Sequence, residues 1–223
     1  MVYTASVWVL PVLLAITLHE AAHGWAAWKL GDDTAKVLGR VSFNPLRHID
    51  PFGTVVLPSL LLLTSSPFLF GWAKPVPVNF HRLRKPRRAM VLVAAAGPAM
   101  NFVLAYAAVL LVHALPFVPA AARVWAGENL LNMVTINVIL AVFNMLPIPP
   151  LDGGRVAVGL LPPALALPLA RLERFGFAII IAIMFVIPYV ARQFGQTFDP
   201  FAWVVIGPVR YIIQILAIAA GIQ

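Results

Sequence analysis

Long apolar runs separated by short polar stretches make up most of the chain. The longest runs cover residues 5–30, 89–115, 129–146, 175–190 and 201–222, and a loop of residues 116–127 joins the second run to the third. About 20 apolar residues are enough for a helix to cross a hydrocarbon core of about 30 Å. The pattern therefore predicts an all-α polytopic membrane protein with about five full transmembrane helices.

A further apolar run, residues 52–70, is interrupted by Pro58 and Pro67. Basic residues lie on both sides of it, namely Lys29, Lys36, Arg40 and Arg47 before it and Arg82, Arg84, Lys85, Arg87 and Arg88 after it. Loops rich in lysine and arginine stay on the cytosolic side of a membrane. We therefore expect residues 52–70 to be a re-entrant or interfacial segment that enters the bilayer and returns.

Two shorter stretches favour extended backbone. Apolar and polar residues alternate over residues 37–43, which predicts a short strand or β-hairpin. In the stretch Trp72–Val78, Pro75 and Pro77 exclude a helix and favour extended geometry. Either stretch is a candidate edge strand.

Composition supports a membrane location. Hydrophobic residues make up 61% of the chain and charged residues 11%, with a mean hydropathy of +0.91, whereas soluble domains average about 25% charged residues. The N-terminus lacks the basic region of a cleavable signal peptide. The net charge is +8, and the basic residues lie beside apolar runs. Contact with the lipid bilayer explains them better than nucleic acid, which we do not expect as a partner. With no cysteine in the chain, a metal ion must be bound by His, Asp or Glu.

The first apolar run contains the pattern H-E-x-x-H, formed by His19, Glu20 and His23. Residues four apart share one face of a helix, so both imidazoles can bind one metal ion, with the carboxylate of Glu20 beside a water molecule. An ionisable residue in a membrane helix costs about 2.5–3.5 kcal/mol on insertion scales, which makes such a residue a candidate for function.

A third metal ligand must come from elsewhere in the chain. Asp152 is the best candidate, because it follows a proline-rich break at the end of an apolar run and precedes two glycines that allow close backbone approach. A turn or cap residue is the simpler interpretation of Asp152 taken alone. The other candidate ligands are His48, His81 and His113.

Three motifs carry a resemblance to a known family. They are H-E-x-x-H at 19–23, G-P-x-x-N at 97–101 and N-x-x-P-x-P-P-L-D-G-G at 144–154. In these motifs the chain resembles the site-2 protease family of intramembrane zinc metalloproteases, in a compact form without PDZ or CBS domains. The resemblance covers residues 1 to about 155, so we expect residues 1–155 to form a catalytic membrane core and residues 156–223 to add two C-terminal membrane helices.

The resemblance implies regulated intramembrane proteolysis, the zinc-dependent hydrolysis of a peptide bond in or near the transmembrane segment of a single-span membrane protein. It implies one Zn²⁺ per chain. The implied ligands are His19, His23 and Asp152, the general base and acid is Glu20, and the residues that hold the substrate strand or orient the site are Asn144 and Asn101.

A helical substrate must unwind before its peptide bond can be attacked. Exposed backbone is tolerated in a bilayer only where protein groups satisfy it, and an edge strand does so by β-addition. We expect this edge in residues 37–43 or in Trp72–Val78, with Trp72, Val76 and Val78 contacting the substrate.

The need for His23 and Asp152 to meet sets the predicted topology. Each lies near the C-terminal end of an apolar run, so both ends must lie at one depth on the same side of the membrane. We expect an external N-terminus, five crossings, a cytosolic C-terminus and an active site near the cytosolic face of a prokaryotic plasma membrane. The alternative functions are a membrane metal-binding or transport protein without peptidase activity and an inactive scaffold. Glu20 argues against transport, since hydrolysis needs a carboxylate beside the ligands and transport does not, and the intact motifs argue against a scaffold.

Overall fold

A computed structural model describes residues 2–63 and 73–222. Within these ranges the chain is mostly helical, and five helices are long and apolar enough to cross a membrane, which confirms the predicted number. They are Val2–Lys29, Pro86–Phe117, Ala120–Asn144, Pro163–Gln193 and Ala202–Ala219.

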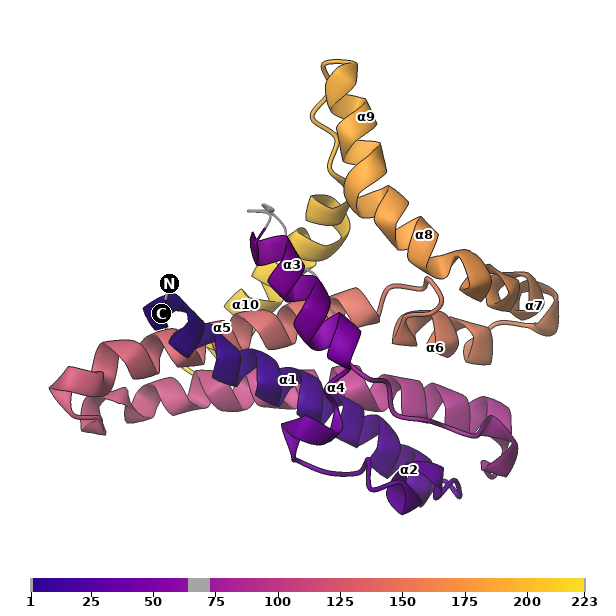
Figure 1. Ribbon diagram of the computed structural model, residues 1–223, viewed down its shortest axis with the longest axis horizontal. Helices are drawn as coiled ribbons and strands as arrows, with labels where there is room; N and C mark the ends of the chain where they lie inside the picture. The colour runs from indigo at the N-terminus through magenta and orange to yellow at the C-terminus, as the bar shows by residue number, and fades with distance from the viewer. Residues whose placement is uncertain (1, 64–72, 223) are drawn as a thin grey trace.

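Three of these helices form the centre of the molecule (Figure 1). Helices α1 (Val2–Lys29), α4 (Pro86–Leu111) and α5 (Ala120–Asn144) all pack against one another. Small residues such as Ala15 and Ala105, each fully buried, occupy their contacts. Such residues let the backbones of membrane helices approach closely, so the three helices form a tight frame for side chains that point inward.

Helix α6 (Asp152–Leu160) returns against α4 after a turn that contains three prolines. A Cβ atom on Gly153 would lie 2.2 Å from the backbone oxygen of Met145, and one on Gly154 would lie 2.3 Å from the backbone nitrogen of Pro149. Only glycine fits at both positions, so the D-G-G sequence is what lets α6 begin in contact with the backbone that follows α5.

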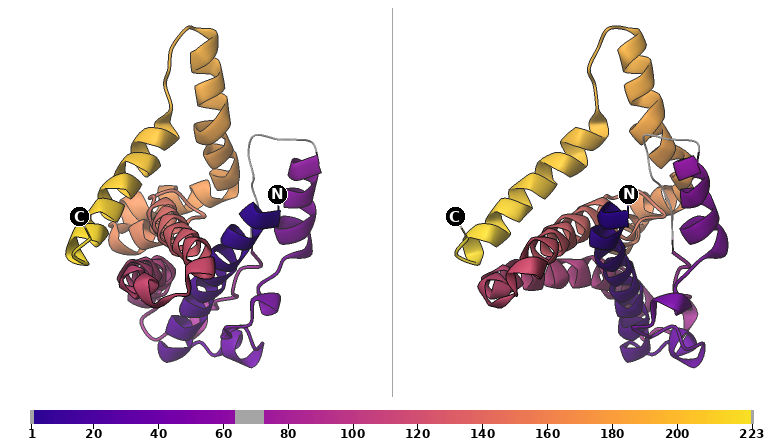
Figure 2. Two further views of the ribbon diagram at one scale, coloured as in Figure 1. Left: turned by 90° about the vertical axis from the view of Figure 1, so that its left-hand side faces the viewer. Right: turned by 60° about the vertical axis from the view of Figure 1, so that its left-hand side comes forward.

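The C-terminal part leaves this frame and comes back to it (Figure 2). Helices α7 (Pro163–Arg171), α8 (Gly176–Ile181) and α9 (Ile187–Gln193) lead away from the central helices, and α10 (Gly207–Ala219) returns to pack along α5.

The residues on either side of the interrupted apolar run lie close together. The run begins with a short helix made of η2 (Pro51–Val56) and α3 (Leu57–Leu63). After residues 64–72, which include Trp72 and lie outside the described part of the chain, the backbone N–H of Lys74 donates to the oxygen of His48, with a distance of 2.9 Å. His48, before the interrupted run, and Lys74, after it, are therefore hydrogen-bonded to each other.

The strand or hairpin expected over residues 37–43 is not found, and no strand occurs elsewhere in the two described ranges. Helix α2 (Thr34–Val37) is a single turn, closed by Gly39 at a φ of +65° and by a hydrogen bond from the N–H of Arg40 to Ala35. The alternating apolar residues misled the prediction because they do not share a packed face. Val37 and Phe43 are 76% and 78% exposed.

The proline-rich stretch matches its prediction more closely. Residues 73–79 contain no helix, as Pro75 and Pro77 require, but they are not paired with another strand. We call them the 73–79 segment.

Candidate metal centre

Helix α1 places His19 and His23 one turn apart on the side that faces the other helices. Both imidazoles are buried, and their Nε2 atoms lie 3.0 Å apart. Asp152, the first residue of α6, brings its Oδ2 to 3.3 Å from each Nε2. The structure therefore brings together the two histidines of the motif and the aspartate that the sequence singled out.

The other ring nitrogen of each histidine is held by an oxygen. His19 Nδ1 lies 2.6 Å from Asn101 Oδ1, and His23 Nδ1 lies 2.7 Å from the backbone oxygen of Val93. Because both partners only accept, each Nδ1 carries the proton and donates it. Each Nε2 then presents a lone pair to the cluster, as a metal-binding histidine requires.

Asn101 acts as an orienting residue in this arrangement. It is fully buried, and its Nδ2 donates to Asn137 Oδ1 at 2.8 Å and to the oxygen of Ala15 at 3.2 Å. These two acceptors fix the amide so that its oxygen faces His19. Of the two roles expected for Asn101, this geometry favours orienting the site over touching a substrate.

The residues present fit a zinc ion. Asp152 Oδ2 is buried without a hydrogen-bond partner, because the Nε2 atoms that approach it carry lone pairs rather than protons. Three acceptor atoms that face one another at 3.0–3.3 Å repel unless a cation lies among them. Zinc–ligand distances of about 2.0–2.1 Å in a tetrahedral site place neighbouring ligands about 3.3 Å apart, which agrees with these separations.

Gly97 is a functional residue whose role sequence reasoning missed, although it belongs to a recognised motif. Helix α4 crosses the ligands at this residue, and a Cβ here would lie 2.4 Å from His23 Nε2 and 2.6 Å from His19 Nε2. The available signal was a glycine inside a membrane helix, where it lowers helix propensity relative to alanine by about 1 kcal/mol.

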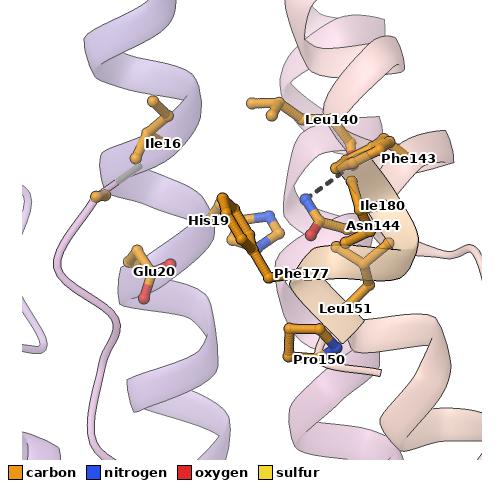
Figure 3. A pocket seen from close by; sticks show the side chains of 11 residues that line it. Ile16, His19, Glu20, Leu140, Phe143, Asn144, Pro150, Leu151, Phe177 and Ile180 are labelled. Carbon is orange, nitrogen blue, oxygen red and sulfur yellow. Dashed lines mark hydrogen bonds between the residues drawn. The ribbon is translucent and has the colours of Figure 1, made fainter. Parts of the chain in front are cut away.

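Two cavities meet at the cluster, and His19, Glu20 and Asn144 line both of them. The larger has a volume of about 540 Å³ and apolar walls (Figure 3). Those walls include Ile16, Leu140, Phe143, Phe177 and Ile180. The smaller, of about 380 Å³, is more polar and is also lined by His23, Asp152, Arg155, Pro75, Val76 and Val78. Phe177 and Ile180 belong to α8, so residues beyond the predicted 1–155 core form part of the larger cavity.

The remaining predicted residues lie around these cavities. Glu20 Oε2 accepts a hydrogen bond of 2.8 Å from the backbone N–H of Val76. Asn144 Nδ2 donates to the oxygen of Leu140, and Figure 3 shows its carbonyl oxygen on the side of the cavity.

The alternative ligands do not join the cluster. In the part of the chain that the structure describes, His19, His23 and Asp152 form the one group of His, Asp and Glu side chains able to hold a metal ion. His48 Nε2 lies against the oxygen of Ser42, and His113 Nε2 lies against the oxygen of Ala220.

A buried His-His-Asp cluster among membrane-spanning helices defines a multi-pass integral membrane protein with a metal centre. Residues 118–187 match the family described as Peptidase family M50. A Bacillus subtilis (strain 168) protein named "Putative zinc metalloprotease YwhC" is 40% identical over 184 residues, which cover 81% of this chain and 80% of that protein. The chain therefore belongs to peptidase family M50, which confirms the resemblance to the site-2 proteases.

Further relatives come from mycobacteria. A Mycolicibacterium smegmatis protein named "Putative zinc metalloprotease Rip2" is 31% identical over 82% of this chain and 68% of its own length. A protein of the same name from Mycobacterium tuberculosis (strain H37Rv) is 32% identical over 79% of this chain and 65% of its own length. No solved structure matches the chain.

Proposed function

We propose that the chain is an intramembrane zinc metalloendopeptidase that hydrolyses a peptide bond in or near the transmembrane segment of a single-span membrane protein. One observation carries the proposal. A carboxylate, Glu20, stands beside a cluster of three metal-ligand atoms, at the junction of an apolar and a polar cavity within the membrane helices. Water, a metal ion and an apolar peptide can meet at this junction.

In this proposal His19, His23 and Asp152 hold one zinc ion. Zinc bound there would polarise a peptide carbonyl and lower the pKa of a water molecule toward about 7. Glu20 takes the proton of the attacking water and then passes it to the leaving amine. A membrane metal-binding or transport protein is not favoured, because it needs no carboxylate in this position.

The cavities suggest how a peptide is held. The apolar walls from α1, α5 and α8 suit a bulky apolar side chain next to the cleaved bond. The oxygen of Asn144 is placed to accept a hydrogen bond from an unwound substrate backbone. Pro75 and Pro77 offer only carbonyl oxygens along the edge of the 73–79 segment, so we propose that a substrate strand pairs there by donating its own N–H groups.

The decisive experiment is cleavage by the purified, reconstituted protein of candidate single-span substrates. We expect about one zinc ion per chain, loss of cleavage on chelation, recovery on adding zinc, and a cut mapped by mass spectrometry within or beside the substrate's transmembrane segment. Equal cleavage by metal-free and zinc-loaded protein would contradict the proposal.

We also propose the orientation in the membrane. The N-terminus lies outside, residues 52–70 enter and return, and the metal centre lies near the cytosolic face of a prokaryotic plasma membrane. The basic residues around α2 and before α4 support this orientation, as does the hydrogen bond between Lys74 and His48. The catalytic core over 1–155 with two added helices over 156–223 remains part of this proposal.

The absence of cysteine from the chain allows a clean topology test. Single cysteines replacing the exposed residues Phe43 and His81 should both react with an impermeant maleimide from the cytosolic side. A cysteine replacing Ala121, an exposed residue in the first turn of α5, should react only from the other side. Labelling of positions 43 and 81 from opposite sides would show that residues 52–70 cross the membrane.

A further inference from the structure

The 73–79 segment passes directly over Glu20. The N–H of Val76 donates to Glu20 Oε2 at 2.8 Å, and the Val76 side chain is buried beside Gly24 of α1. Because Pro75 and Pro77 have no N–H, Val76 supplies the only backbone donor between Lys74 and Val78. The segment therefore offers one donor at this point, and that donor holds the carboxylate proposed as general base.

Anchors fix the segment on both sides of Val76. At Lys74 the N–H donates to the oxygen of His48 at 2.9 Å, and the oxygen accepts from Arg40 Nη2 at 2.6 Å. At the other end, the N–H of Asn79 donates to Asp32 Oδ2 at 2.6 Å.

Arg40 is costly to place where it is. Arg40 is only 7% exposed, and its Nε is buried without a hydrogen-bond partner. Among residues 2–63 and 73–222 no carboxylate forms an ion pair with it. Burying a charge without an opposite charge beside it is unfavourable. The nearby exposed Arg47 already bonds the oxygen of Gly39 in the same loop, so the bond from Arg40 to Lys74 serves something other than closing that loop.

Asp32 also bonds the 73–79 segment, through the N–H of Asn79. It is fully buried at the end of α1, and its other oxygen accepts from the N–H and the hydroxyl of Thr34. The adjacent Asp33 instead forms an exposed ion pair with Arg82. Arg40 and Asp32 therefore bond the 73–79 segment, whereas the residues of the same charge near them, Arg47 and Asp33, bond elsewhere.

We propose that Arg40 and Asp32 are positioning residues for Glu20, and that they act by fixing the 73–79 segment so that the Val76 N–H holds the Glu20 carboxylate. The inference rests on the proposed role of Glu20 as general base. Catalytic groups must be held within about 0.5 Å of their productive positions, and a displacement of about 1 Å can lower a rate about 100-fold. Two buried charges outside the metal centre thereby serve the chemical step.

Hydrogen exchange tests the contact without any substrate. Within residues 74–79 only Lys74, Val76, Val78 and Asn79 carry backbone amides, so residue-resolved exchange in the zinc-loaded protein can report on Val76 separately. We expect Glu20→Ala to speed exchange at Val76 at least tenfold and Arg40→Met to speed exchange at both Lys74 and Val76. Unchanged exchange at Val76 in Glu20→Ala would overturn the inference even if Arg40→Met failed to fold.

Steady-state cleavage tests the consequence. We expect Arg40→Met and Asp32→Ala to lower kcat about tenfold or more, with KM within twofold and zinc content unchanged, and Arg40→Lys to recover part of the loss by donating to Lys74. The matched controls Arg47→Met and Asp33→Ala should keep the wild-type kcat. A wild-type kcat in Arg40→Met would refute the positioning role, whereas wild-type cleavage in Glu20→Gln would refute the proposed function itself.

Discussion

Replacing Glu20 with glutamine is expected to lower kcat about 10³-fold or more while zinc content and KM stay close to those of the wild type. Glutamine has nearly the same shape, and its oxygen can still accept the hydrogen bond from the Val76 N–H. It cannot take a proton from water at neutral pH. General acid–base catalysis contributes about 10²–10⁴ to a rate, so the loss of this one function predicts the size of the effect.

The measurement is cleavage of a reconstituted single-span substrate, with zinc determined by elemental analysis on the same preparations. Glu128→Gln is the matched control, because Glu128 lies in the first half of α5, away from the metal-site end of that helix, and should retain the wild-type rate. Undiminished cleavage by zinc-loaded Glu20→Gln would show that another group moves the proton. Loss of zinc from this variant would instead point to a role for Glu20 in metal binding.

The parts of the site that sequence predicts are those set by local spacing. His19, Glu20 and His23 belong to one helix, so their mutual geometry follows from the helical repeat alone. Asp152 was found by a different argument, since the two-histidine motif needs a third ligand and the D-G-G sequence allows close approach. The structure brings His19, His23 and Asp152 together.

The contacts that sequence does not reveal run between distant segments and involve the backbone. The acceptor for His23 is the carbonyl of Val93, and the donor for Glu20 is the N–H of Val76. Every residue has such groups, so no residue type marks them. Arg40 was read only as a topology signal, because its buried environment depends on a segment far along the chain.

Secondary structure was predicted well where apolar runs are long and poorly at their edges. The expected loop over residues 116–127 is wrong, because α5 already begins at Ala120. Arg123 lies in this stretch, and a charged residue at the end of a membrane helix can lie beyond the hydrocarbon while the backbone stays helical. Arg123 here bonds the carbonyl oxygens of Pro116 and Val118, which close the preceding turn.

Replacing Gly97 with alanine is expected to remove zinc binding without unfolding the protein. The added Cβ would lie 2.4 Å from His23 Nε2 and 2.6 Å from His19 Nε2. The imidazoles cannot turn away without breaking the hydrogen bonds that hold their Nδ1 atoms on Asn101 and Val93. We therefore expect zinc affinity to fall about 100-fold or more, and cleavage to fall with it.

The rest of α4 should tolerate the change, because alanine favours a helix over glycine by about 1 kcal/mol. Zinc should therefore raise the Tm of the wild-type protein but not that of Gly97→Ala, since only a state that binds the ion is stabilised by it, while the two metal-free proteins should unfold at similar temperatures. Gly127→Ala is the matched control, because a Cβ at that position meets nothing closer than Leu115 at 3.7 Å, and it should bind zinc and cleave like the wild type. Full zinc occupancy and a wild-type kcat in Gly97→Ala would place the metal somewhere other than among His19, His23 and Asp152.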